Sequence, residues 1–253
     1  MRDHRRYCGY RWHLLAPTQT HCLPKRREPR LNRIGLIHAT PLAVQPIAAS
    51  FAALWPQARL HNILDDSLSV DRARDGRLTE AMTQRFLDLS HYAVGCGCEA
   101  LLFTCSAFGP AIEAAAARSG VPTFKPNEAM FDAALAVTPA DAVLRIGLLA
   151  TFEPSIESMA QELQARASGR GLRIAIEAAH VPEAMDDLQR GQADLHHQKI
   201  AHAAAALPAC DVVMLAQFSM AAAQPLTQGA CAVPVLSSPD CAVTELRRKI
   251  THV

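Results

Sequence analysis

One cysteine stands where a thiol can do chemistry. Cys105 follows the apolar run 100–103 and precedes Gly109-Pro110, and Pro suits the first turn of a helix. We therefore expect Cys105 at a turn from a strand into a helix. Free backbone N–H groups and the positive end of the helix dipole at such a turn can stabilise a thiolate and an adjacent substrate carboxylate. The position indicates a catalytic thiol, although a buried cysteine that only packs has the same features.

A histidine is the second candidate for proton transfer. His38 ends the apolar run that begins at Arg33. An unperturbed imidazole titrates near neutrality, so His38 could contact substrate or shuttle a proton. An ordinary loop histidine is the alternative.

We expect neither a metal nor a nucleotide cofactor. Cys96 and Cys98 are too close together for zinc-ligand spacing, and the histidines at 196, 197 and 202 have no fitting carboxylate or cysteine nearby. The glycines at 95 and 97 precede an expected strand, which is the reverse of the dinucleotide arrangement.

The elements that must position these side chains follow an α/β pattern. From Arg33 onward, short runs of Val, Ile and Leu alternate with longer Ala-rich amphipathic segments, which is typical of βαβ units around a parallel sheet. We expect two pseudo-symmetric three-layer α/β lobes with mainly parallel sheets, the first over 33–138, joined by the C-terminal helix 236–253, and the second over 139–235. The carboxyl ends of the strands would line a cleft between the lobes. Strands are expected near 33–38, 59–63, 100–104, 121–124, 145–150, 172–177 and 211–215, and helices near 42–54, 78–94, 110–118, 127–136, 154–167, 182–206, 219–224 and from about 239.

Composition narrows the class of protein. Half of the 253 residues are apolar, which provides material for packed cores. Residues 1–32 hold eight Lys and Arg against two acidic residues and show no periodicity, so we expect a disordered or spurious N-terminal extension. The remainder has 17 basic and 22 acidic residues, which argues against a nucleic-acid partner. Without an apolar run long enough to span a membrane, and with cysteines that need no disulfides, a cytoplasmic protein that does not bind membranes is expected.

Four segments carry a family resemblance. Leu102 to Ala115 resembles the first cysteine motif of the aspartate/glutamate/hydantoin racemase superfamily, especially the hydantoin racemase form, in which Phe-Gly and Pro follow the Cys. The segments Arg33–Pro41, Ile146–Thr151 and Val212–Met220 resemble, in the same order and spacing, the first strand, the second-lobe strand that ends in a substrate-binding Thr, and the strand that carries the second cysteine. The resemblance spans residues 33–253.

The resemblance implies a reaction without a metal, pyridoxal or nucleotide. In the family, two cysteines face each other across the cleft, and one removes the α-proton of a carbon acid while the other delivers a proton to the opposite face. Cys105 would be the base or nucleophile. The positions to which the resemblance assigns substrate binding are His38, Thr40, Ser106, Ala107, Thr151, Gln217 and Ser219.

The sequence departs from the family pattern at three acid or base positions. Gln217 stands at the second cysteine, Ser219 at the histidine of glutamate racemases, and His38 near their first-strand Asp. Glutamine cannot act as an acid or base near neutral pH. Cys241 is a candidate second proton donor, because it starts the last helix in a loop that borders the cleft in relatives. Packing at the helix cap is the alternative.

Our leading hypothesis is a cofactor-independent, racemase-like isomerase that acts on a small carboxylate or related carbon acid. A single-cysteine decarboxylase or lyase, related to arylmalonate decarboxylases, and a covalent reaction like that of maleate isomerases are alternatives within the superfamily. A non-catalytic carboxylate-binding protein is the third. A homodimer is expected because dimers are common among the enzymes that the chain resembles.

Overall fold

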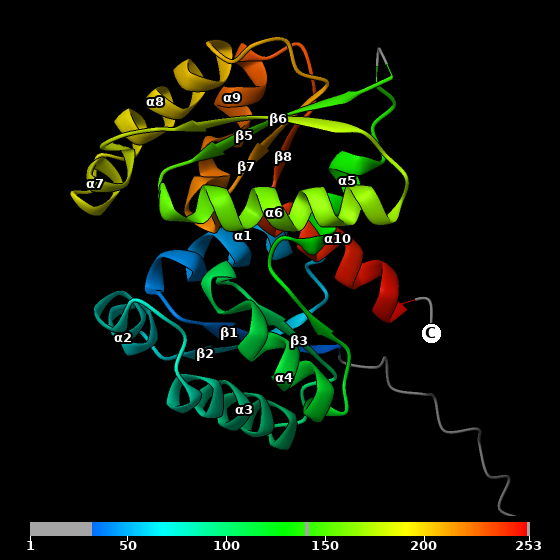
Figure 1. The fold of residues 1–253 in the computed structure, drawn as a ribbon. Helices are drawn as coiled ribbons and strands as arrows, with labels where there is room; N and C mark the ends of the chain where they lie inside the picture. The colour runs from blue at the N-terminus through cyan, green and yellow to red at the C-terminus, as the bar shows by residue number, and fades with distance from the viewer. Residues whose placement is uncertain (1–31, 140–141, 252–253) are drawn as a thin grey trace, which may run out of the picture. The chain divides into compact units, whose positions relative to one another are not determined.

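Two four-stranded parallel sheets, each with helices on both faces, form the structure (Figure 1). The computed structural model describes residues 32–139 and 142–251. The expectation for 1–32 therefore lies outside the described residues, apart from Asn32. The strand order is β2-β1-β3-β4 in the first sheet and β6-β5-β7-β8 in the second. The α/β fold with two parallel sheets is confirmed.

The first sheet is built from residues 33–124. Its central strands are buried on both sides, and alternate residues enter different cores: Ile34 and Leu36 face α1 and α10, whereas Ile37 faces α3 and α4. The strands are β1 (Arg33–His38), β2 (Arg59–Leu64), β3 (Ala100–Phe103) and β4 (Thr123–Phe124). The helices are α1 (Val44–Leu54), α2 (Ser67–Asp75), α3 (Glu80–Gly95) and α4 (Gly109–Ser119), with the 3-10 turns η1 (Pro41–Ala43) and η2 (Ser106–Phe108).

The second sheet has the same design. Its core lies mainly between the central strands and the helices α5 and α6, where Leu148 and Met214 are fully buried. The strands are β5 (Leu144–Ala150), β6 (Ile174–His180), β7 (Val212–Leu215) and β8 (Val235–Ser237). The helices are α5 (Glu128–Leu135), α6 (Pro154–Gly169), α7 (Ala184–Gln189), α8 (Ala193–Ala205), α9 (Gln224–Ala230) and α10 (Ser238–Thr251), with the 3-10 turn η3 (Phe218–Ala223).

The second sheet repeats the pairing of β1, β3 and β4 with a constant offset in β5, β7 and β8. Ile34 of β1 pairs with Ala100 of β3, and Ile146 of β5 pairs with Val212 of β7, so both partners are shifted by 112 residues. The pairing of the last two strands in each sheet follows the same shift. Continuing this register past the strand ends makes Gln217 the counterpart of Cys105. The internal repeat gives this correspondence without reference to any other protein.

Two helices, α5 and α10, do not follow the lobe boundaries that the sequence predicts. α5 falls in the range 33–138 assigned to the first lobe, but Met130 and Phe131 pack in the core of the second. α10 contacts both α1 and α5 and lies between the two sheets (Figure 1). Residues 236 and 237 belong to β8 of the second sheet, so the final helix starts two residues later than the range 236–253 implies.

Three local differences have physical reasons. α2 was not predicted because its nine residues are mostly polar and only Leu68 is buried. The single helix predicted over 182–206 is wrong: Gly191, at φ 78°, ends α7 in a left-handed cap, and the amide of Gln192 donates to the carbonyl of Asp187. The helix predicted at 219–224 is mainly the 3-10 turn η3, followed by α9.

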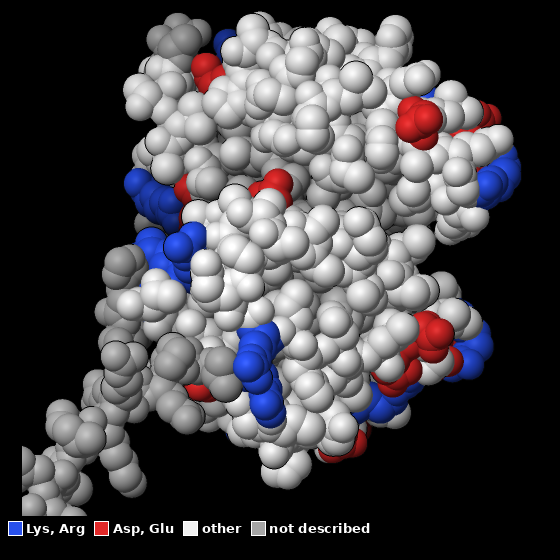
Figure 2. All heavy atoms as spheres, turned by 180° about the vertical axis from the view of Figure 1, so that it is seen from behind, with Lys and Arg blue, Asp and Glu red and all other residues white. Residues whose placement is uncertain are grey.

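None of the helices in the described ranges is long and apolar enough to cross a membrane. On the face drawn in Figure 2, charged side chains lie in small groups of both signs.

The repeat also allows a matched test of packing at two glycines. A Cβ at Gly35 would lie 2.8 Å from Cδ2 of Leu101 and 3.2 Å from Cβ of Ala93, and both neighbours are fully buried. At Gly147 the nearest atom is Cδ1 of Leu207, at 2.7 Å, on a partly exposed side chain that can rotate away. Gly35→Ala should lower the free energy of unfolding in urea by about 1–3 kcal/mol, and Gly147→Ala by less.

Gly169→Ala is the control for this comparison, because no atom lies within 4 Å of its added Cβ. Equal losses of unfolding free energy in Gly35→Ala and Gly169→Ala would show that the close approach of β1 to α3 does not constrain the first core.

Candidate active site

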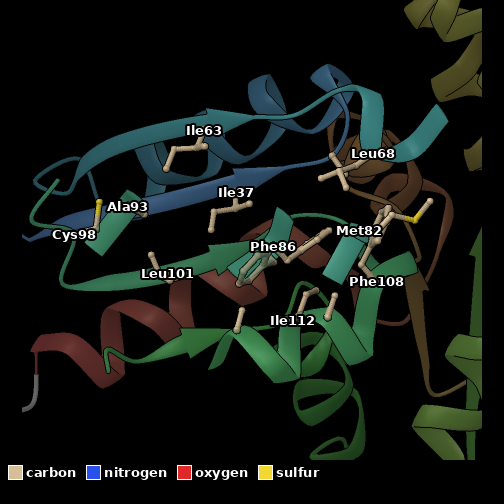
Figure 3. Close-up of a cluster of buried hydrophobic side chains, with 14 residues drawn as sticks. Ile37, Ile63, Leu68, Met82, Phe86, Ala93, Cys98, Leu101, Phe108 and Ile112 are labelled. Atoms are coloured by element: carbon tan, nitrogen blue, oxygen red, sulfur yellow. The ribbon is translucent and has the colours of Figure 1, made fainter. Parts of the chain in front are cut away.

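Cys105 lies where the sequence predicts it, at the carboxyl edge of the first sheet. It lies two residues after the end of β3 and is the N-cap of η2, which leads into α4 with Pro110 in its first turn. Its side chain is partly buried and packs against the core cluster that contains Phe86 and Phe108 (Figure 3). The sulfur is thus held over an apolar surface, with the start of a helix beside it.

Burial dominates the titration of this thiol. Loss of hydration raises the pKa of Cys105, and the nearby backbone amide of Ala107 acts on the pKa in the opposite direction with a smaller effect. The thiol is therefore protonated near neutral pH in the ligand-free protein. The thiol can donate its proton directly. It can act as a base or nucleophile only after it has lost that proton.

His38 is inside the protein and connects three strands. Its ring is fully buried, with Nδ1 2.9 Å from Oγ1 of Thr104 and Nε2 3.0 Å from Oδ1 of Asn62. Desolvation lowers its pKa, and the hydrogen bond to Asn62 opposes this shift. The ring is therefore neutral, with both nitrogens engaged. In this geometry His38 holds Thr104, the neighbour of Cys105, and presents no free nitrogen to a substrate.

Gln217 makes a network of its own at the carboxyl edge of the second sheet. Its Oε1 accepts hydrogen bonds from the amide of Thr151, at 2.9 Å, and from Oγ1 of Thr151, at 3.3 Å. Its Nε2 donates to Oγ of Ser155 at 2.7 Å. The side chain thereby joins the ends of β7 and β5 to the first turn of α6. At the position that corresponds to Cys105 there is consequently a neutral amide that cannot exchange protons near neutral pH.

The remaining predicted residues lie in the turns after the central strands. The hydroxyl of Thr40 accepts from the amide of Leu42 at 3.4 Å and caps η1. Ser106 and Ala107 are exposed in η2, and Ser219 is nearly buried in η3. η3 contacts η1 and α1, which brings the carboxyl end of β7 against the turn after β1. No hydrogen bond within the described residues joins Cys105 to Gln217, and the expected cleft between them stays a prediction.

Cys241 has surroundings that favour the packing alternative. Its side chain packs against the core of the second sheet, and burial together with the charge of Asp240 raises its pKa to about 12. Asp240 itself accepts hydrogen bonds of 2.6 Å from the hydroxyls of Ser50 and Ser237. A thiol with such a pKa is a weak acid, so these contacts do not support a role in proton donation.

Sequence reasoning missed three residues that support the site. Asn62, Thr104 and Ser155 hold His38 or Gln217 through the hydrogen bonds above. Thr104 is the neighbour of the candidate thiol and Asn62 is a polar residue near the end of a strand, so both could have been noticed. The role of Ser155 depends on the contact between β7 and α6, for which the sequence carries no signal. Among the described residues, no group of three or more His, Cys, Asp or Glu side chains is arranged to hold a metal ion.

Comparison with protein families gives a clear assignment. The family described as Asp/Glu/hydantoin racemase matches residues 34–246. The chain belongs to this family. Membership in this family supports the interpretation of the protein as a racemase-like isomerase. A comparison with curated protein sequences returns no match.

Solved structures share the fold at low sequence identity. The glutamate racemase isoform from Bacillus anthracis is 15% identical, with a TM-score of 0.62 over 87% of this chain and 82% of that chain. An aspartate racemase homologue from Pyrococcus horikoshii, 15% identical, has a TM-score of 0.65 over 87% and 100% of the two chains. Allantoin racemase from Klebsiella pneumoniae is 16% identical and also has a TM-score of 0.65, over 87% of this chain and 88% of that chain. At these identities the likeness establishes the fold alone.

The burial of Cys105 predicts how its reactivity changes with pH. Because its pKa is raised, alkylation by iodoacetamide should increase with pH through an inflection above that of a free cysteine in an unstructured peptide. The rate at Cys105 is followed by mass spectrometry of the peptide that contains it. An inflection below the peptide value would show that the helix end stabilises the thiolate more than burial destabilises it.

Proposed function

We propose that this protein is a cofactor-independent, racemase-like isomerase, that its substrate is a small carboxylate or related carbon acid, and that Cys105 is its base or nucleophile. The observation that carries the proposal is the placement of Cys105 between the end of β3 and the start of η2. Exposed amides in this turn can accept a carboxylate and the negative charge that develops on it.

The chemistry begins with transfer of a proton from carbon to sulfur. Once the Cys105 thiol has released its own proton to solvent water, the thiolate takes the α-proton and leaves an enolate, whose oxygens receive hydrogen bonds from the amides of Ser106 and Ala107. Thr151 would bind the substrate from the other sheet, where Gln217 fixes its backbone. The proton then returns from Cys105 to the face from which it came, because Gln217 has no proton to deliver to the opposite face. Return to the same carbon gives exchange without inversion, and return to another atom of the delocalised anion gives an isomer.

A decarboxylase or other lyase is the second candidate, and the network around Gln217 is the observation that favours it. A reaction that replaces a leaving carboxylate by a proton needs one acid on one face, whereas inversion of a stereocentre needs a donor on each face. Cys105 is protonated at rest and can serve as that single acid. The two candidates share the thiol and differ in which bond to carbon is broken.

Solvent-deuterium incorporation tests the shared step. The protein is incubated in D2O with amino acids, hydantoins, maleate and arylmalonates, and exchange and products are followed by NMR. We expect incorporation of deuterium into at least one of these acids, and its rate should fall by about 10²–10⁴-fold in Cys105→Ser, because the serine hydroxyl is a far weaker acid and base. Retention of all carbon atoms identifies an isomerase, and loss of CO2 identifies a decarboxylase.

The absence of exchange and turnover with every one of these compounds would contradict the catalytic proposal. Cys231→Ser is a matched control, since Cys231 is a partly buried cysteine packed against a different core cluster. If a carboxylate binds tightly while Cys105 reacts no faster than a free cysteine at the same thiolate fraction, the protein is a carboxylate-binding protein without catalysis.

A further inference from the structure

Two cysteines stand on neighbouring segments at the amino ends of β7 and β8. Cys210 lies two residues before β7, and Cys231 is the C-cap of α9, in an extended conformation. The amide of Val213 donates to the carbonyl of Pro234 at 2.9 Å, and each cysteine comes three residues before one of these partners. Neighbouring parallel strands are about 4.8 Å apart, and disulfide-bonded cysteines have Cα atoms roughly 4.4–6.8 Å apart. The backbone spacing at this edge therefore permits a disulfide.

Both side chains lie on the same face of the second sheet. A Cβ added at Gly147 would meet Sγ of Cys210 at 3.4 Å, together with side-chain atoms of Leu207 and Val213. Cys231 packs against the core cluster that contains Val213, and Leu207 packs against the same cluster. Both cysteines are free thiols and only partly buried, so a small reagent can reach them.

The electrostatics of the two thiols also indicate that they are close. Burial raises the pKa of Cys210 most, the negative charges of Glu177, Asp211 and Cys231 raise it further, and Arg145 opposes them. A charge at the protein surface has such an effect only at short range. Burial raises the pKa of Cys231 as well. Near neutral pH both groups are therefore protonated thiols, and their reactivity increases with pH.

The internal repeat shows that this pair belongs to one half of the molecule. The offset of 112 residues relates Cys210 to Cys98 and Cys231 to Ser119. Cys98 is buried, and the hydroxyl of Ser119 lies 3.0 Å from Oγ1 of Thr123. The first half therefore has the same backbone plan without the second thiol.

We propose that Cys210 and Cys231 form a redox-responsive modification site, at which a low-molecular-weight disulfide such as oxidised glutathione converts the two thiols into a disulfide. The thiolate of one cysteine attacks the small disulfide, forms a mixed disulfide and releases one thiol. The thiolate of the other cysteine then attacks the mixed disulfide at the protein sulfur and releases the second thiol. The two cysteines are oxidised, the small disulfide is reduced, and the two released thiols carry away the two protons.

The bond would close the segment 210–231, which contains β7, η3 and α9. Cross-linking restricts the unfolded chain more than the folded one, in which the two segments are already neighbours. Oxidation therefore stabilises the second half of the molecule, with Gln217 inside the closed loop. The step does not involve Cys105, so this proposal and the proposed function can fail separately.

Equilibration with glutathione tests the proposal. The full-length protein is equilibrated at a series of ratios of oxidised to reduced glutathione, both native and in concentrated urea, and free thiols are then blocked with N-ethylmaleimide. Cleavage before aspartate by endoproteinase Asp-N places the two cysteines in separate fragments, 194–210 and 211–239, so mass spectrometry detects their bond as one linked species. We expect the native protein to form the linked species at a ratio at least about tenfold more reducing than the unfolded protein requires, because folding holds the thiols together.

Two serine variants provide the matched comparison. Cys231→Ser should abolish the linked species and leave Cys210 as a mixed disulfide with glutathione. Cys96→Ser removes a partly buried thiol at the amino end of the first sheet and should leave the linkage unchanged. Mixed disulfides at Cys210 and Cys231 without a linked species in the native protein, or a linkage that forms equally readily in urea, would overturn the proposal.

Discussion

Parallel pairing of the central strands is the constraint on which the site depends. β1 and β5 each have a parallel strand on both sides, so the carboxyl ends of three neighbouring strands meet at one edge of each sheet. The turns after these strands carry Cys105 in the first sheet and Thr151 and Gln217 in the second. The close packing of Gly35 on Ala93 and Leu101 is part of the same constraint, because it sets how near α3 comes to the sheet.

The two halves share the register of their central strands but carry different residues at the strand ends. In the first, a strand end carries a thiol and the adjoining Thr104 is fixed by a buried neutral histidine. In the second, the corresponding strand end carries the side-chain amide of Gln217, whose oxygen is hydrogen-bonded to Thr151 and whose nitrogen is hydrogen-bonded to Ser155. The repeat therefore preserves the scaffold, while the candidate thiol lies in one half only. This asymmetry is the physical basis on which we propose proton transfer on a single face.

The sequence predicts much of this arrangement, because the dominant signals are local. Buried parallel strands appear as short apolar runs, and the turn at Cys105 is marked by Gly109 and Pro110. Other features depend on contacts between distant segments. The packing of α5 in the second core, the burial of His38 and the hydrogen bond from Gln217 to Ser155 have no local signature. α2 was missed because a short polar helix lacks apolar periodicity.

The stereochemistry of proton exchange tests the central claim most directly. An exchanging chiral acid, supplied as each pure enantiomer in D2O, is followed with the wild-type protein, Gln217→Cys and Gln217→Ala. The account predicts that the wild-type protein exchanges the α-proton of one enantiomer without inverting it, and that Gln217→Cys, with a thiol on the second face, gains interconversion that Gln217→Ala lacks. Rapid interconversion by the wild-type protein, unchanged by either substitution, would contradict the claim that Cys105 works alone.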